Sequence, residues 1–153
     1  MNVRWRELVL FRHGTAAPAR LPGGDFERPL TAAGRQLVAR SAAHLAAEPM
    51  PPTLLLFSLA PRAAATAALL AEALALPAPA LLPLEALYLA TPQHIVALLA
   101  EHGGDTPCIA VVGHNPGLSE LGARYDARLR DAVLDAGDYW RIRRTGPPPG
   151  DLA

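Results

Sequence analysis

The fold is indicated by the stretch Leu8-Val9-Leu10-Phe11-Arg12-His13-Gly14, an apolar, strand-like run that ends in an arginine and a histidine. The same pattern occurs at Leu54-Leu55-Leu56-Phe57-Ser58, which is followed by Arg62, and at Ile109-Ala110-Val111-Val112-Gly113-His114-Asn115. In an open parallel α/β sheet, ligands bind where the carboxyl ends of the strands leave the sheet. Three such strand ends would bring two histidines and two arginines to one crevice.

Segments with helical patterns alternate with these strands. We expect helices over residues 31–47, 62–76, 91–103 and 118–125, a proline-rich irregular connection over 77–90, and a last edge strand over 138–143. Strands that alternate with helices at this spacing indicate βαβ units. The sequence therefore predicts a three-layer α/β/α sandwich with a mostly parallel central sheet.

Length and composition fit one globular unit. The chain has 153 residues, of which 51% are apolar, and we expect a single domain over residues 1–153 with a loose, proline-containing tail at 146–153. Basic and acidic residues balance at 14 each, so no overall positive field exists to attract nucleic acid or an anionic membrane. Any anion site must therefore be local.

The sequence also suggests where the protein acts. Its first 12 residues, which include Arg4, Arg6 and Glu7, are too short and too charged for the apolar region of a signal peptide, and no run reaches transmembrane length. Cys108 is the single cysteine, which excludes an internal disulfide and fits a reducing compartment. We expect a cytoplasmic protein that works as a monomer.

The residues at the strand ends suit phosphoryl transfer. Arg12 and Arg62 offer guanidinium forks that match two phosphate oxygens at once. A neutral imidazole of His13 or His114 could attack phosphorus and form a phosphohistidine intermediate that water later hydrolyses. Gly14 would let the chain turn sharply after His13 and present its amide to the ligand.

Together, these three motifs resemble the histidine phosphatase superfamily over about residues 8–140, a family that includes phosphoglycerate mutases and acid phosphatases. Arg28-Pro29-Leu30-Thr31 with Gly34, and the segment from Val112 to Gly117, are similar to the SixA branch of protein-phosphohistidine phosphatases. The resemblance implies a phosphoglycerate mutase-like fold with no cofactor.

The same resemblance assigns roles to residues. It implies that His13 is the nucleophile, that Arg12 and Arg62 hold the phosphate, and that His114 is the second histidine on the phosphoryl oxygens. We also place Gly14, Ser58 and Asn115 among the substrate-contacting residues and expect Ser58 to anchor the turn that aims Arg62.

Three positions depart from the family pattern: Thr15, Ala65 and Leu89. Many members carry a proton-donating glutamate where this chain has Leu89, and a leucine donates no proton. An alkoxide leaving group needs a general acid, whereas imidazole, with a pKa of about 6.5 for its conjugate acid, needs little help. This favours a P–N substrate, with Asp25 in the first loop, or else Glu85, as a substitute donor for esters.

The sequence leaves three functions open. The first is a phosphohistidine phosphatase that acts on a phosphorylated protein. Only the loops 15–29 and 76–90 could cover the site, so we expect a shallow, open site, which suits a protein substrate. The second is a phosphomonoesterase for a small phosphate ester, and the third is a degenerate phosphate-binding module. We expect no metal site, because His44, His94 and His102 lie at helical positions without partners at ligand spacing.

Overall fold

The computed structural model of the chain describes residues 4–20 and 22–146. A five-stranded sheet forms its centre, in the order β3-β2-β4-β1-β5. Strands β1 (Glu7–Arg12), β2 (Leu54–Phe57), β3 (Leu81–Pro83) and β4 (Cys108–Gly113) are parallel, and β5 (Tyr139–Arg143) runs antiparallel to β1. The sheet is therefore mostly parallel, as the sequence predicts.

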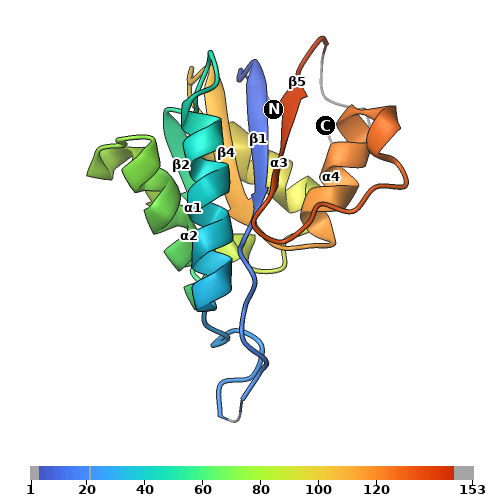
Figure 1. Ribbon diagram of the computed structural model, residues 1–153. Helices are drawn as coiled ribbons and strands as arrows, with labels where there is room; N and C mark the ends of the chain where they lie inside the picture. Colours follow the sequence, from blue (N-terminus) through green and yellow to red (C-terminus); the bar gives the residue numbers. More distant parts are fainter. Residues whose placement is uncertain (1–3, 21, 147–153) are drawn as a thin grey trace.

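Helices cover both faces of the sheet (Figure 1). One face carries α1 (Ala32–Ala46) and α2 (Pro61–Ala73), and the other carries α3 (Pro92–His102) and α4 (Gly117–Tyr125). Three short 3-10 helices, η1 (Ala78–Ala80), η2 (Glu85–Leu87) and η3 (Ala127–Leu129), lie in the connections. This arrangement confirms the three-layer α/β/α sandwich and the phosphoglycerate mutase-like fold.

Local sequence explains where the elements lie. Every residue of β4 is buried, as expected for a central strand covered on both faces. The hydroxyl of Thr31 accepts a hydrogen bond from the amide of Gly34 at the start of α1, and Thr91 does the same for His94 at the start of α3, where Pro92 takes the first position. These caps match the expected helix starts.

The structure differs from the expected elements in the connection 77–90 and at the end of α2, and it leaves most of the expected tail undescribed. The connection 77–90 is not wholly irregular, because β3 pairs with β2 in the register Leu55↔Leu81; its three residues are too few for a periodic signal. Helix α2 ends at Ala73, earlier than expected. The loose tail expected at 146–153 lies, apart from Gly146, outside the described residues.

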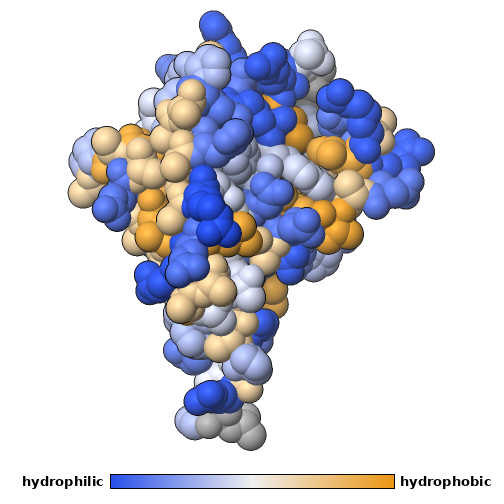
Figure 2. Space-filling model, viewed as in Figure 1, coloured by the Kyte–Doolittle hydropathy of each residue, from blue (hydrophilic) through white to orange (hydrophobic). Residues whose placement is uncertain are grey.

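The loop between β1 and α1 projects from the carboxyl edge of the sheet and forms the narrow lower part of the molecule in Figures 1 and 2. None of the helices in residues 4–20 and 22–146 has the length and apolar character needed to cross a bilayer. The carboxyl ends of β1, β2 and β4 lie where this loop leaves the sheet, so we expect the site between the loop and this edge of the sheet.

Candidate active site

His13 directly follows β1 and is 8% exposed. Its Nδ1 lies 2.8 Å from the carbonyl oxygen of Gly14, which can only accept a hydrogen bond, so Nδ1 carries the proton. Nε2 is then the unprotonated nitrogen, and it accepts a hydrogen bond from Nε of Arg62 at 3.3 Å. The backbone thus fixes the tautomer in which Nε2 is unprotonated and its electron pair faces Arg62.

Arg62 lies in the first turn of α2 and is 2% exposed, so its charge is buried at the centre of the site. Its Nη2 donates to Nδ1 of His114 at 3.3 Å and to Oδ2 of Asp25 at 3.0 Å, and its Nη1 donates to the carbonyl oxygen of Asp25 at 2.7 Å. A single guanidinium therefore connects the ends of β1 and β4 with the long loop.

His114 directly follows β4, and its ring lies 5.1 Å from the ring of His13, centroid to centroid. Because Nδ1 accepts from Arg62, Nε2 of the neutral ring carries the proton and donates to the hydroxyl of Ser58 at 2.8 Å. The Ser58 hydroxyl also accepts from the amide of Ala60 at 3.2 Å. Ser58 thus holds both His114 and the turn that leads into α2.

Arg12 ends β1 beside His13. Its Nη1 donates to the carbonyl oxygen of Leu134 at 2.9 Å, while its Nε is buried and has no hydrogen-bond partner among the described residues. A buried, charged donor without an acceptor is costly unless a ligand supplies one. Arg12 therefore suits an anion that enters the site.

The surroundings of the two histidines keep both neutral. Burial, together with the nearby positive charge of Arg62 and Arg12, lowers the pKa of His13 from 6.5 to about 4. Burial, then His13 and Arg62, lower the pKa of His114 to about 3. At neutral pH the site thus combines two uncharged imidazoles with two cationic arginines, which suits the binding of a dianion and its attack by nitrogen.

These pKa shifts predict how stability depends on pH. In the unfolded chain the imidazoles titrate near their ordinary pKa of 6.5, so between pH 6.5 and 4 the unfolded state binds more protons than the folded state. The free energy of unfolding therefore falls as the pH falls through this window, by about 3 kcal/mol for His13 alone. Urea denaturation at a series of pH values between 7 and 4.5 measures the slope.

The non-titrating variant His13→Asn should show a shallower slope than the wild type. His44→Asn is the matched control for the loss of an imidazole, because His44 is exposed on α1 and makes none of the site contacts described above. A wild-type slope for His13→Asn would contradict the assignment of a depressed pKa to the folded state of His13.

The expectation of a shallow, open site is wrong for this conformation. The two loops expected to arch over the site meet: the hydroxyl of Tyr88 donates to Oδ2 of Asp25 at 2.6 Å, and the Tyr88 ring packs edge-on against Phe26 and His114. Beneath them, His13, His114 and Arg62 are almost completely buried. The site is closed because Asp25, in the loop between β1 and α1, accepts hydrogen bonds from Arg62 and so holds this loop over the histidines.

Asp25 reaches the site, but not in the form that a proton donor needs. Hydrogen bonds from Tyr88 and Arg28, and the charge of Arg62, hold the pKa of the Asp25 carboxyl well below its usual range. The group is ionised at neutral pH and has no proton to give. Glu85 opens η2 as an exposed residue and takes part in none of the site contacts described above.

Two expected substrate contacts are already used within the protein. The amide of Gly14 is not presented to a ligand but donates to the hydroxyl of Thr66 at 3.0 Å. The side-chain amide of Asn115 donates to the carbonyl oxygen of Leu134 at 2.9 Å and accepts from Ser119. Both residues hold neighbouring segments in place, because their donors face backbone and helix rather than the cavity.

Three further residues contribute to the site without having been predicted from the sequence. Thr66 lies one helical turn after Arg62, and its hydroxyl bridges the carbonyl oxygen of Arg62 and the amide of Gly14; the i, i+4 spacing was the signal. Tyr88 stands next to Leu89, in the motif that departs from the family. Leu134 acts through its backbone carbonyl, which no sequence pattern announces.

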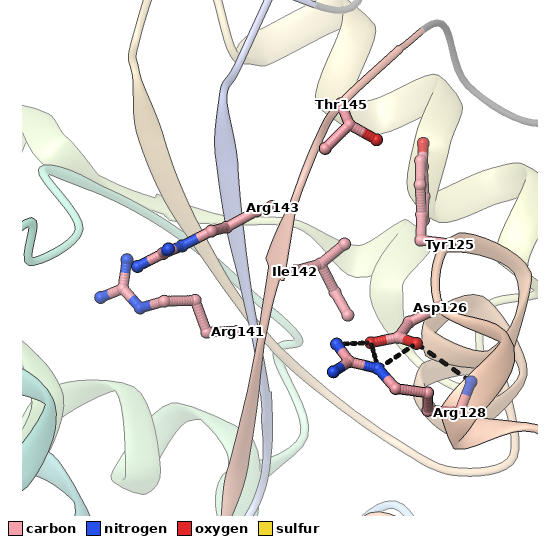
Figure 3. Close-up of a pocket in the computed structure, with 7 residues that line it drawn as sticks. All are labelled: Tyr125, Asp126, Arg128, Arg141, Ile142, Arg143 and Thr145. Atoms are coloured by element: carbon pink, nitrogen blue, oxygen red, sulfur yellow. Dashed lines mark hydrogen bonds and ion pairs between the residues drawn. The ribbon is translucent and has the colours of Figure 1, made fainter.

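A second hollow lies between the end of α4 and β5 (Figure 3). Its Arg128 pairs with Asp126, and its Arg141 pairs with Glu7 and Glu48, so these charges are satisfied within the fold. Neither histidine of the site lines it. Across residues 4–20 and 22–146, the structure also groups no three histidine, cysteine or carboxylate side chains in a way that could hold a metal ion.

Comparisons with known proteins agree with this geometry. The family model of the histidine phosphatase superfamily (branch 1) matches residues 8–84, which include Arg12, His13 and Arg62. No curated protein sequence matches the chain.

Solved structures resemble it over nearly its full length. One is a protein from Agrobacterium tumefaciens assigned as the phosphohistidine phosphatase SixA, with 22% identity, a TM-score of 0.82 and 92% of each chain covered. A protein from Nakamurella multipartitia with the same assignment has 27% identity and a TM-score of 0.76, covering 96% of this chain and 88% of that one. The mycobacterial glucosyl-3-phosphoglycerate phosphatase has 17% identity, a TM-score of 0.65 and 89% of each chain covered.

The family match covers half of the chain, and the fold and the strand-end histidines and arginines agree with it. The chain belongs to the histidine phosphatase superfamily, branch 1, and is an enzyme of the phosphatase class.

Proposed function

We propose that the enzyme hydrolyses phosphohistidine on a protein through a phosphorylated His13. The observation that carries the proposal is the pair of contacts on His13: Nδ1–H is held by the Gly14 carbonyl, which leaves Nε2 as an unprotonated nitrogen against Arg62. Arg12 and Arg62 would bind the phosphoryl oxygens, and His114, whose ring lies 5.1 Å from that of His13, would contact these oxygens as well.

In the first step, the electron pair of His13 Nε2 forms a bond to phosphorus while the P–N bond of the substrate breaks. If the other ring nitrogen of the substrate imidazole is protonated, the leaving group departs as neutral imidazole. In the second step, water attacks phosphorus and the bond to Nε2 breaks, which returns His13 to its neutral form with the proton on Nδ1. Inorganic phosphate carries away the water's oxygen and one of its protons, and the other proton is released to solvent. The covalent intermediate thus divides one difficult displacement into two easier ones.

Among the residues that the structure describes, no protonated carboxyl group contacts the site, and this supports a P–N substrate. Leu89 is 52% exposed where relatives place a glutamate, and the carboxylate nearest to the site, Asp25, is ionised. An alkoxide would have to leave without a proton, whereas imidazole, with a conjugate-acid pKa of about 6.5, leaves readily at neutral pH.

Exposed apolar side chains beside the site support a protein as the carrier of the phosphoryl group. Leu59 follows Ser58 and is 43% exposed, Leu89 follows Tyr88, and Val133 precedes Leu134. Leu89 also has a φ of 50°, a left-handed conformation that is unfavourable for leucine. A strained, exposed leucine next to the site fits an interaction surface better than it fits packing.

The substrate can be tested by measuring phosphate release from a histidine-phosphorylated phosphotransfer domain and from an aryl phosphate. We expect the enzyme to prefer the phosphohistidine by at least about a hundredfold in kcat/KM, because only the ester needs a general acid. Preference for the ester would contradict the proposal, and no turnover of either substrate would favour a phosphate-binding module.

Leu89→Ser separates docking from chemistry in this assay. It should raise KM for the phosphorylated protein, leave kcat for that substrate as it is, and leave turnover of the aryl phosphate unchanged. The control is Met50→Ser, because Met50 is an exposed apolar residue in the loop after α1, away from the residues of the site.

A small phosphate ester is the second candidate, and the contact between the two loops favours it. Asp25 and Tyr88 enclose the histidines as a lid would enclose a metabolite. The similarity in fold to a glucosyl-3-phosphoglycerate phosphatase fits this candidate as well.

A further inference from the structure

We propose that the carboxylate of Asp25 occupies the phosphoryl site in the free enzyme and competes with the substrate's phosphoryl group for the donors of Arg62 and Tyr88. The inference rests on the proposed function, because it concerns the same site. Its consequence is that every anion must displace Asp25 before it can reach His13.

The donors of Arg62 are almost fully used. Nε donates to His13, Nη2 donates to His114 and to Oδ2 of Asp25, and Nη1 donates to the carbonyl oxygen of Asp25. Two of these four contacts are with Asp25, and they use both terminal nitrogens, Nη1 and Nη2, which would otherwise form the fork for two phosphate oxygens. Arg62 cannot bind a phosphoryl group in that way while Asp25 remains.

The carboxylate is held as a phosphoryl group would be. Its Oδ2 accepts from Arg62 at 3.0 Å and from the hydroxyl of Tyr88 at 2.6 Å, and its Oδ1 accepts from Arg28 at 3.1 Å. Three donors from three separate segments thus converge on one small anion. The low pKa of the carboxyl, caused first by Tyr88, keeps it charged at neutral pH.

The position of Asp25 allows it to leave. Its side chain is 47% exposed, whereas Arg62 beneath it is 2% exposed, so Asp25 lies between Arg62 and solvent. Gly23 and Gly24 precede it with φ values of 111° and 57°, conformations that glycine adopts without strain and that let the loop change its path. The loop projects from the body of the molecule and can move without disturbing the core (Figure 2).

Displacement adds the same cost to every ligand. When only a fraction of the enzyme has a free site, the apparent dissociation constant rises by the inverse of that fraction. Inorganic phosphate has no other contacts that could offset the cost. A phosphoryl group carried on a protein has contacts beyond the site that can offset this cost, so it can still bind at concentrations at which the free ion does not, while the ratio of the two dissociation constants stays the same.

The test measures binding of inorganic phosphate and of vanadate by titration calorimetry, without turnover. Asp25→Asn, which removes the charge and keeps one acceptor oxygen, should lower the dissociation constant about tenfold, and Asp25→Ala should lower it at least as much. Glu27→Gln is the matched control: it removes an exposed carboxylate from the same loop and should change the constant less than about twofold.

A second arm examines Tyr88. In the Asp25→Asn background, Tyr88→Phe should weaken phosphate binding several-fold, because the freed hydroxyl then donates to the phosphoryl oxygens. Unchanged or weaker phosphate binding in both Asp25 variants would overturn the proposal and make Asp25 a positioning residue for Arg62. So would an equal gain in Glu27→Gln.

Failure of this inference can be told apart from failure of the proposed function. Tighter phosphate binding in the Asp25 variants together with no turnover of phosphohistidine would uphold the competition and refute the function. Phosphohistidine turnover that depends on His13, together with unchanged phosphate binding in the Asp25 variants, would uphold the function and refute the competition.

Discussion

Replacement of His13 by alanine is expected to reduce turnover by at least about four orders of magnitude, because the step that forms the P–N bond then has no nucleophile. The orienting contact of Nδ1 with Gly14 and the depressed pKa both serve this nitrogen. Samples quenched in alkaline detergent should contain an acid-labile, base-stable phosphoenzyme in the wild type and none in His13→Ala. Quantitative detection of phosphohistidine after a single turnover provides the measurement.

His44→Ala is the control for this variant, because His44 is an exposed histidine on α1 and its loss should change neither turnover nor the phosphoenzyme. Phosphoenzyme that persists in His13→Ala would show that another group, such as His114, attacks phosphorus. Circular dichroism of both variants verifies that the fold is retained.

Replacement of Arg62 is expected to have the second largest effect. Arg62→Ala removes the buried guanidinium that lies between His13 and His114 and should reduce kcat/KM by about a thousandfold, the loss typical of a residue that stabilises transition-state charge on phosphoryl oxygens. Arg62→Lys keeps the charge but not the fork, and we expect about a hundredfold loss. Steady-state kinetics with both substrates of the preference assay measures these values.

The control is Arg40→Lys, because Arg40 is exposed on α1 and far in sequence from the strand ends. Equal activity of Arg62→Lys and the wild type would show that a point charge suffices and would contradict bidentate binding. In Arg62→Ala, the pKa of His13 should also rise back toward 6.5, because the charge of Arg62, after burial, is one cause of the lowered value. NMR titration of the His13 ring measures this change.

Much of the fold could be predicted from local patterns. The apolar runs of β1, β2 and β4, and the capping residues Thr31 and Thr91, are short-range signals that act over a few residues. Strand β3 escaped prediction because three residues beside prolines show no periodicity and are ordered by pairing with β2.

The sequence indicated which side chains lie together at the sheet edge better than it indicated their contacts, and the catalytic roles of these residues stay predictions. His13, His114 and Arg62 do meet, because strand ends of a parallel sheet share one edge. Gly14 and Asn115 were expected to face a ligand, but the donors of both are used by Thr66 and by Leu134. Such bonds depend on which backbone groups lie nearby in space.

The sequence by itself determined the parallel sheet, the four side chains at its carboxyl edge and the superfamily, because each is signalled by short motifs whose residues are close together in the chain. Only the tertiary structure decided which nitrogen of each histidine carries the proton, and that Asp25 closes the site on Arg62. That contact joins residues 37 positions apart through a loop without periodicity. Its geometry follows from packing and from the need to satisfy a buried charge, which no local pattern specifies.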